Sequence, residues 1–96
     1  MPTYARTARF RREFRRLDPA QQRAFLAMVE RFVNGLARGQ FDPTLRVKRV
    51  QGTHDVWEIS WAPDGRATFS YGPEVRPGEP HVIWRRVGTH RVLDEP

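Results

Sequence analysis

In Val56-Trp57-Glu58-Ile59-Ser60-Trp61, the side chains alternate strictly between apolar and polar from Trp57 onward. A period of two predicts a β-strand that places the two tryptophans and Ile59 on one face and Glu58 and Ser60 on the other. Such two-faced strands are typical of antiparallel sheets that are covered on a single side. The stretch therefore predicts a sheet with one packed apolar face and one open polar face.

The residues around this stretch continue the pattern. Pro63-Asp64-Gly65 is a tight-turn signal, and residues 66–71 alternate again with their polar and apolar side chains on opposite faces. A connection rich in Gly and Pro over 72–80 precedes a final apolar strand, which we predict over 81–87. Upstream, residues 45–50 also alternate and are either a strand or the approach to one.

The first 40 residues carry a helical period instead. After an extended stretch over 3–6, Thr7 is placed to cap a short helix whose apolar stripe is Phe10, Phe14 and Leu17. Asp18-Pro19-Ala20-Gln21 has the chemistry of a helix start, with a capping box, and Gly39 is a natural stop. The second helix repeats its apolar residues at helical spacing: Phe25, Met28, Val29, Phe32 and Leu36.

Together these periods predict an α+β fold over residues 1–96, with a single domain. An N-terminal strand and a two-helix hairpin pack on one face of a small, mainly antiparallel sheet, because two helices can cover only one side. The polar faces of the strands then share the other side. We expect a cationic concave surface there, formed by Glu58, Ser60, Arg66, Thr68 and Arg85, with Lys48 and His90 near its edges.

Composition narrows the classes of function. The 96 residues carry a net charge of +6, and Lys48 is the only lysine among the 17 basic residues. This balance favours a polyanionic partner, either nucleic acid or an acidic protein. The absence of cysteine excludes disulfides and thiolate metal sites. Without an apolar run of membrane-spanning length or a signal-peptide core, we expect a cytoplasmic protein with no membrane partner.

Two residues stand out as candidates for chemistry. His90 follows the final strand in Gly88-Thr89-His90, where a side chain is held firmly yet reachable, and histidine suits proton transfer near neutral pH. It could equally be a cap or a surface residue. Arg66 opens a strand on the polar face and is either a solvated partner of Glu58 or a fixed guanidinium that binds phosphate.

The remaining histidines and tryptophans fit structural roles. We expect His54 at the surface of a loop and His81 in a structural position, and no pair of histidines has the spacing of metal ligands on one element. We therefore predict no metal. Trp57, Trp61 and Trp84 are expected in the core. The arginines of the first helix, with Glu13 as their only acidic neighbour, form a solvated face or contact phosphates.

The order of these elements resembles the RelE/ParE toxin superfamily of bacterial type II toxin–antitoxin systems. The resemblance covers nearly the whole chain and rests on Leu45-Arg-Val-Lys-Arg-Val50, Val56-Trp57-Glu58-Ile59, Asp64-Gly65-Arg66-Ala-Thr-Phe69 and Arg86-Val-Gly88-Thr89-His90. The Gly-Thr-His ending is similar to the YafQ-like branch, and Trp-Glu-Ile is similar to HigB-like members.

The resemblance implies a ribosome-dependent endoribonuclease that cuts mRNA in the decoding site by metal-free attack of the 2′-OH, without a cofactor. Arg66 matches the family arginine that holds the phosphate, His90 matches the acid, and Asp64 matches the acidic residue of YafQ-like members. No motif identifies the general base, and the candidates for this role are Lys48 and Glu58. We expect the RNA to be bound by basic residues around this site: Arg46, Arg49, Arg85, Arg86 and Arg91.

The second strand departs from the family pattern. RelE-like members place lysines where this chain has Trp57 and Ile59, and YafQ-like members have a histidine where it has Ser60. ParE-type members share the fold but inhibit DNA gyrase, so a gyrase inhibitor without nuclease activity is the alternative, and a basic nucleic-acid-binding module is a third. The implied partners are a cognate antitoxin together with the ribosome and mRNA, or gyrase.

Overall fold

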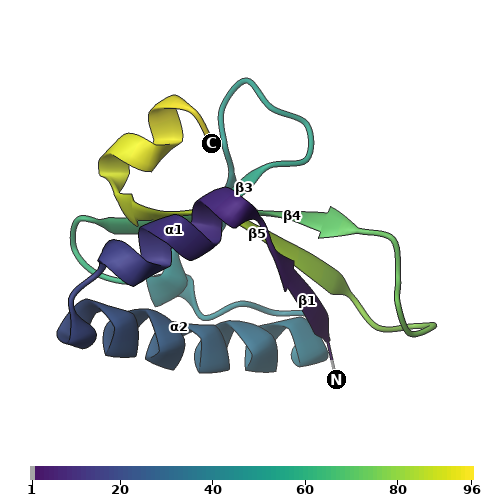
Figure 1. The fold of residues 1–96 in the computed structure, drawn as a ribbon. Coiled ribbons are helices and arrows are strands. Elements are labelled where there is room, and N and C mark those ends of the chain that lie inside the picture. The colour runs from purple at the N-terminus through teal and green to yellow at the C-terminus, as the bar shows by residue number, and fades with distance from the viewer. Residues whose placement is uncertain (1) are drawn as a thin grey trace.

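A five-stranded sheet with the strand order β1-β5-β4-β3-β2 forms the centre of the structure (Figure 1), a computed structural model that describes residues 2–96. β5 pairs with β1 in parallel and with β4 antiparallel, and the other pairs are antiparallel. The elements are β1 (Thr3–Arg6), α1 (Ala8–Arg16), α2 (Pro19–Arg38), the 3₁₀ helix η1 (Pro43–Leu45), β2 (Lys48–Arg49), β3 (Trp57–Ser60), β4 (Gly65–Gly72), β5 (His81–Thr89) and the 3₁₀ helix η2 (His90–Asp94). The predicted α+β class and the mainly antiparallel sheet are confirmed.

Local chemistry places the helix ends where the sequence predicts them. The hydroxyl of Thr7 accepts a hydrogen bond from the Phe10 amide at 3.0 Å and caps α1. Asp18 and Gln21 form both bonds of a capping box at the start of α2, at 2.8 and 2.9 Å. Gly39 ends α2 in the left-handed conformation, with φ 71°. These contacts satisfy main-chain groups that the helix itself leaves unpaired.

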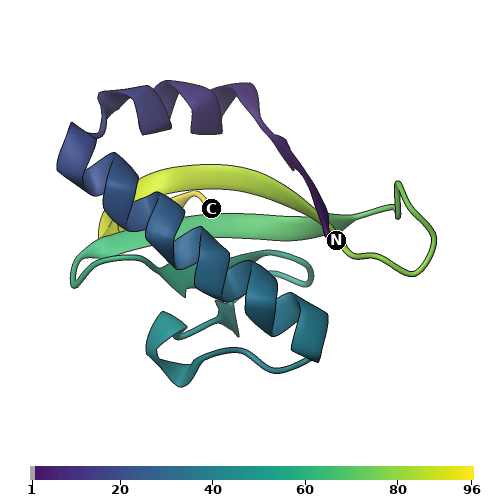
Figure 2. The same ribbon diagram turned by 90° about the horizontal axis from the view of Figure 1, so that it is seen from below.

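The apolar core lies between the sheet and the two helices. α2 crosses one face of the sheet diagonally, as Figure 2 shows, and α1 packs against β5. Trp84 of β5 is central to this layer, because its ring lies 5.3–6.1 Å from four phenylalanine rings that come from both helices and from β4: Phe10, Phe25, Phe32 and Phe69. Aromatic pairs at this separation add to the stabilisation from burial.

An irregularity in β5 sets which side chains face the helices. Phe69 is opposite Trp84, whereas the preceding residue, Thr68, is opposite Arg86, so Arg85 is skipped in the pairing. Trp84 and Val87 are three residues apart, an odd spacing, yet this β-bulge directs both side chains into the core. Strict alternation would have placed the two side chains on opposite faces.

The polar face of the sheet is not fully open, which corrects the sequence prediction. Residues 90–96 fold back over it, opposite α2 (Figure 1). Thr68 is completely buried beneath this segment, and its hydroxyl donates to the main-chain oxygen of Pro96 at 3.2 Å, as does Arg85 Nε at 3.1 Å. The buried side chain of Val92 anchors the segment. The final strand also extends to Thr89, two residues beyond its predicted end.

The region before β3 also differs from the alternating pattern. Only Lys48 and Arg49 form a strand, because η1 occupies the preceding residues and Arg46 turns into the left-handed region, with φ 52°. The sequence left open whether residues 45–50 were a strand or its approach, and most of them are the approach. None of the helices within residues 2–96 has the length and apolar character that a membrane span requires.

An ion pair joins α1 to the part of β5 that extends beyond β1. Arg86 binds Glu13 through Nε, at 3.2 Å to both carboxylate oxygens, and through Nη2, at 2.5 Å. The Val87 amide also donates to this carboxylate, at 3.4 Å. The hydrogen bonds to Glu13 raise the pKa of the Arg86 guanidinium above its usual value. Both side chains are largely buried, so the pair is poorly screened by water.

Glu13→Ala should lower the free energy of unfolding by about 2–3 kcal/mol, because it leaves a largely buried guanidinium and an edge amide without their carboxylate. Urea denaturation measures the change. Arg9→Ala is the matched control, since the Arg9–Glu95 pair is exposed and its loss should cost less than about 1 kcal/mol. Equal effects of the two substitutions would contradict a special role for Glu13.

Candidate functional site

The sheet register aligns a row of polar side chains across four strands on the face opposite α2. Lys48 of β2 is opposite Glu58 of β3, Glu58 is opposite Thr68, and Thr68 is opposite Arg86. Directly opposed residues have Cβ atoms about 5 Å apart. Two of the predicted site residues, Lys48 and Glu58, are therefore neighbours.

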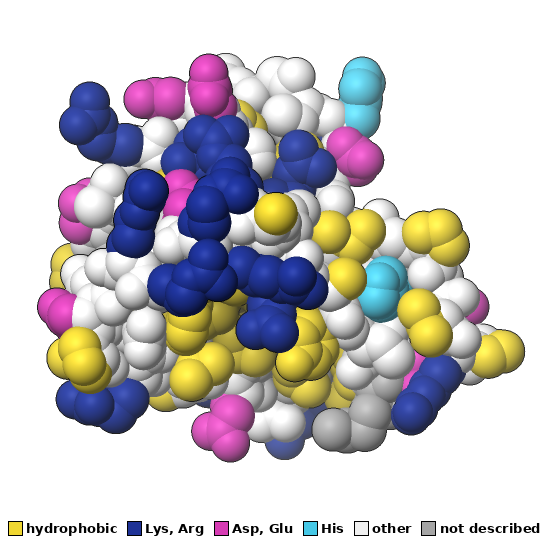
Figure 3. Space-filling model, viewed as in Figure 1, with side chains coloured by type: hydrophobic (Ala, Val, Ile, Leu, Met, Phe, Trp, Pro, Cys, Tyr) yellow, Lys and Arg dark blue, Asp and Glu magenta, His cyan; other side chains and the backbone are white. Residues whose placement is uncertain are grey.

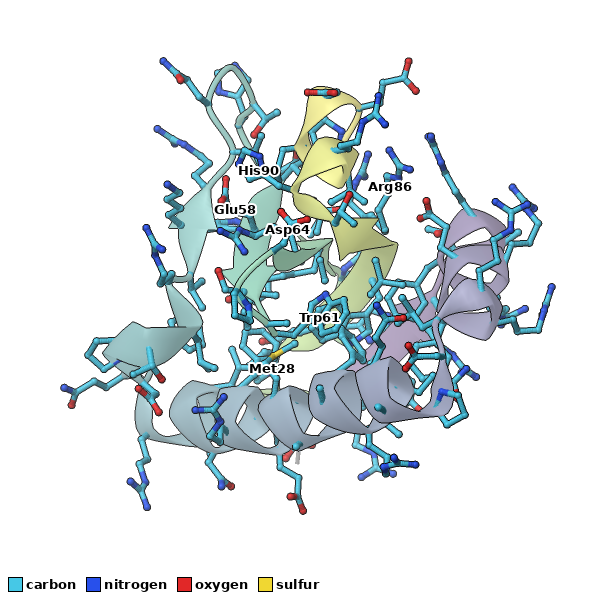
Figure 4. The ribbon with its side chains drawn as sticks, turned by 90° about the vertical axis from the view of Figure 1, so that its left-hand side faces the viewer. Met28, Glu58, Trp61, Asp64, Arg86 and His90 are labelled. Atoms are coloured by element: carbon cyan, nitrogen blue, oxygen red, sulfur yellow. The ribbon has the colours of Figure 1, made fainter. Side chains whose placement is uncertain are left out.

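A second row runs beside the first, toward the end of the sheet. Arg66 is opposite Ser60 on one side and Gly88 on the other, and it is a diagonal neighbour of Glu58, a relation that corresponds to about 7–8 Å. Gly65 pairs with Thr89 at the end of the ladder between β4 and β5. Asp64, just before Gly65, and His90, just after Thr89, are therefore the next residues beyond this pair. Figure 4 shows Glu58, Asp64 and His90 away from α2, on the side of the C-terminal segment.

The guanidinium of Arg66 is held by the turn that precedes it. Nη1 donates to three main-chain oxygens of this turn, those of Ala62 at 3.3 Å, Pro63 at 3.2 Å and Gly65 at 2.9 Å. The other two nitrogens make no hydrogen bond within residues 2–96. Arg66 is thus fixed at one end and free to donate at the other, which is the arrangement that a preorganised anion ligand requires.

The turn itself is rigid because Trp61 packs directly against it. The indole Nε1 donates to the Arg66 main-chain oxygen at 3.0 Å, and the ring lies over Gly65. A Cβ atom on Gly65 would be only 2.6 Å from that ring, so the position requires glycine for space. The predicted core position of Trp61 is confirmed, and its ring also supports the candidate site.

The candidate acid and base residues differ in exposure. Glu58 is only 8% exposed, and its carboxylate makes no hydrogen bond or ion pair with the other described residues. Lys48, Asp64 and His90 are exposed. His90 begins η2 and is held by its main chain, since Thr89 caps this helix.

The five arginines expected to bind RNA fall into two groups. Arg46, Arg49 and Arg91 are exposed. Arg85 is instead partly buried and Arg86 largely buried, both are bound to the C-terminal segment, and Arg86 is also neutralised by Glu13. The sequence did not reveal this difference, because Glu13 and Arg86 are 73 residues apart.

The other two histidines lie outside the site. His54 is exposed in a loop, and His81 Nδ1 is 2.7 Å from the Thr3 hydroxyl at the start of the β1–β5 pair, in agreement with the predicted surface and structural roles. The described part of the chain, residues 2–96, contains no group of three His, Asp or Glu side chains that could hold a metal ion.

An apolar groove on another face was not predicted. It has a volume of about 380 Å³ and runs between β1, α1 and α2, where Phe14, Val29, Val33 and Leu36 are among the residues that line it. Tyr4 and Leu26 lie at the groove and are well exposed. Figure 3 shows this apolar strip as a hollow, with basic side chains gathered above it over α1.

Solved structures with the same arrangement of elements exist, although no protein-family model and no curated protein sequence matches the chain. RelE in the RelB–RelE antitoxin–toxin complex from Methanococcus jannaschii superposes with a TM-score of 0.63 over 95% of each chain, at 13% identity. This chain has the fold of RelE/ParE-type toxins. The toxin of the Escherichia coli DinJ–YafQ complex gives a TM-score of 0.62, at 13% identity, over 97% of this chain and 98% of its own. The YoeB/ParE toxin from Agrobacterium tumefaciens gives 0.64, at 10% identity, over 92% and 98%.

The resemblance to this superfamily is confirmed at the level of the fold. The similar structures are toxins of toxin–antitoxin systems, and two of those described above contain an antitoxin. They include both YafQ and a YoeB/ParE toxin, so the fold alone does not choose between the two targets considered from the sequence.

Gly65→Ala should destabilise the protein by about 1–3 kcal/mol, because the added methyl group collides with the Trp61 ring in a tightly packed turn. Gly88→Ala is the matched control in the neighbouring strand, where the nearest atom, Val92 Cγ1, is 3.1 Å from the added carbon and belongs to a side chain that can adjust. Urea denaturation of both variants measures the difference. Equal stabilities would mean that the Trp61–Gly65 contact does not fix the turn.

Proposed function

We propose that this protein is the toxin of a type II toxin–antitoxin system and cuts mRNA on the ribosome, in the cytoplasm, as a metal-independent endoribonuclease. The observation that carries the proposal is the anchored guanidinium of Arg66, two of whose nitrogens make no hydrogen bond within residues 2–96. In the sheet register, Arg66 is a diagonal neighbour of Glu58 and is opposite Gly88, two residues before His90. The toxin fold supports the same proposal.

In the proposed reaction, the 2′-OH of one nucleotide attacks the adjacent phosphorus. The bond to the 5′-oxygen of the next nucleotide breaks, which yields a 2′,3′-cyclic phosphate and a 5′-OH end. Arg66 would stabilise the additional negative charge on the phosphate. His90 would donate a proton to the leaving oxygen, and Asp64, which precedes the Gly65–Thr89 pair that His90 follows, would be the second acidic group of the site.

The general base would be Glu58 or Lys48, which are opposite each other in the first row. Glu58 is the better supported of the two, because this largely buried residue is a diagonal neighbour of Arg66 and its carboxylate makes no hydrogen bond or ion pair within residues 2–96. Lys48 would then attract the RNA.

Gyrase inhibition is the second candidate function. It is favoured by β3, where Ile59 is buried in the core and Trp57 is half-buried at the positions at which RelE-like toxins carry lysines. The similarity to a YoeB/ParE toxin supports it as well. A gyrase inhibitor would have no need of Arg66 and His90 together, so the two functions predict different effects of the same substitutions.

The antitoxin would bind the apolar groove between β1, α1 and α2 through an amphipathic acidic segment that folds as it binds. The exposed side chains of Tyr4 and Leu26 supply the apolar contact, and the arginines above the groove complement the acidic residues. Apolar burial would provide most of the affinity, while charge would mainly accelerate the encounter.

Arg66→Ala should reduce the rate of mRNA cleavage on programmed ribosomes by about 100- to 1000-fold, and His90→Ala by about 100- to 10,000-fold. The double variant should lose less than the product of these factors, since both groups act in one transition state. Arg76→Ala, in the exposed loop between β4 and β5, is the control and should cleave normally. Growth arrest on induction provides the readout in cells.

Full toxicity of both single variants would refute the nuclease proposal. In that case, supercoiling and relaxation assays with purified gyrase would show the activity instead.

Leu26→Asp should weaken binding of the cognate antitoxin by about 10- to 100-fold, because it places a charge in the apolar contact. Val75→Asp makes the same kind of change at an exposed apolar residue in the β4–β5 loop and should leave the affinity unchanged. Isothermal titration calorimetry at low and moderate salt measures both. Dissociation of the wild-type complex at moderate salt would instead make charge the main source of affinity.

A further inference from the structure

A second, polar hollow lies next to Arg66 and has no role in the reaction proposed above. It has a volume of about 280 Å³ and is open to solvent. Its charged lining consists of Arg31 from α2, Arg46 after η1 and Arg66, and the hydroxyl side chains of Thr44 and Ser60 also line it. No carboxylate is among the lining residues, so no side chain that lines the hollow carries negative charge.

In one wall of the hollow, the charge of Arg31 is neutralised and its side chain is held by neighbouring residues. Arg31 donates to the Thr44 hydroxyl at 3.2 Å and forms an ion pair with Asp42 at 3.5 Å. The Thr44 amide and hydroxyl both donate to Asp42, and the amide is the main cause that holds the pKa of this carboxyl below its usual value. Asp42 therefore offsets the charge of Arg31. The positive charge available to a ligand comes from Arg46 and Arg66.

Arg46 has an unusual backbone conformation. With φ 52° and ψ 45°, it is the only non-glycine residue with a positive φ within residues 2–96. Glycine is preferred in this conformation, because a side chain makes it strained. The conformation ends η1, since the Arg46 amide donates to the main-chain oxygen of Pro43 at 3.1 Å. The side chain of Arg46 is exposed and makes no hydrogen bond or ion pair within residues 2–96. Its guanidinium is therefore available to a ligand.

We propose that this hollow binds a phosphate of the RNA backbone next to the phosphate that reacts at Arg66, with Arg46 as its principal ligand and Ser60 as a hydroxyl donor. Guanidinium and hydroxyl groups are the usual ligands of backbone phosphates, and the fork of an arginine matches the phosphate oxygens. The hollow is smaller than a typical small-molecule pocket and open at the surface, which suits a strand that passes through it. The site rests on the proposed function, since it extends the same RNA path.

The test measures RNA binding separately from cleavage. A fluorescent single-stranded RNA that is 2′-O-methylated throughout cannot react, and its affinity for the purified protein is measured by anisotropy over a range of salt concentrations. Arg46→Gly removes the guanidinium while its backbone suits the positive φ, so the variant should melt at the wild-type temperature or above. Its affinity for this RNA should fall roughly 10-fold, and the slope of log K against log salt should decrease by about 0.7.

Arg76→Ala is the control for the loss of one positive charge and should change the affinity far less. Arg46→Lys, which keeps the charge but lacks the fork, should bind with intermediate affinity. Equal affinities of Arg46→Gly and Arg76→Ala would overturn the proposal. So would tight binding of inorganic phosphate with no effect of Arg46 on RNA, because the hollow would then hold a free anion.

The outcomes also separate this site from the proposed function. If the wild-type protein cuts mRNA on the ribosome but Arg46→Gly binds RNA like the control, the phosphate site is wrong and the nuclease stands. If the wild-type protein does not cut mRNA but RNA binding depends on Arg46, the site stands and the proposed activity is wrong.

Discussion

The packing of Trp84 is the interaction on which the rest of the structure depends. Its ring contacts phenylalanines from α1, α2 and β4, so one side chain of β5 links both helices to the middle of the sheet. Burial of so many aromatic rings in a chain of 96 residues supplies a large part of the apolar stabilisation of a small domain. Removal of this ring would leave a cavity in contact with every layer of the core.

The bulge at Arg85 is the means by which the sheet serves both the core and the polar face. It lets Trp84 and Val87 face the helices, and it places Arg86 opposite Thr68 in the polar row. Arg86 then reaches Glu13 of α1, and the C-terminal segment closes over Thr68. One skipped residue therefore connects the packing of the core with the layout of the candidate site. Bulges commonly redirect side chains in this way beside functional sites.

The sequence predicted what is decided locally. The capping box of Asp18, the stop at Gly39 and the alternation in β3 and β4 depend on neighbouring residues, and the structure has each of them. The alignment of Glu58 and Arg66 on one face followed from the same alternation. The return of residues 90–96 over the sheet, the Glu13–Arg86 pair and the left-handed Arg46 could not be predicted, because they depend on contacts between distant segments. The one sequence signal of that return is the aliphatic Val92, five residues after Val87, the last apolar residue of the final strand.

The Glu13 carboxylate also affects how the sheet meets other chains. Unpaired amides along a strand edge attract further strands and promote aggregation. Beyond β1, the outer edge of β5 is bonded instead to the Thr7 hydroxyl and to Glu13. Of the two outermost strands, β2 has two residues, both basic, and β1 has four. A second copy of this chain would therefore find little continuous edge on which to extend the sheet.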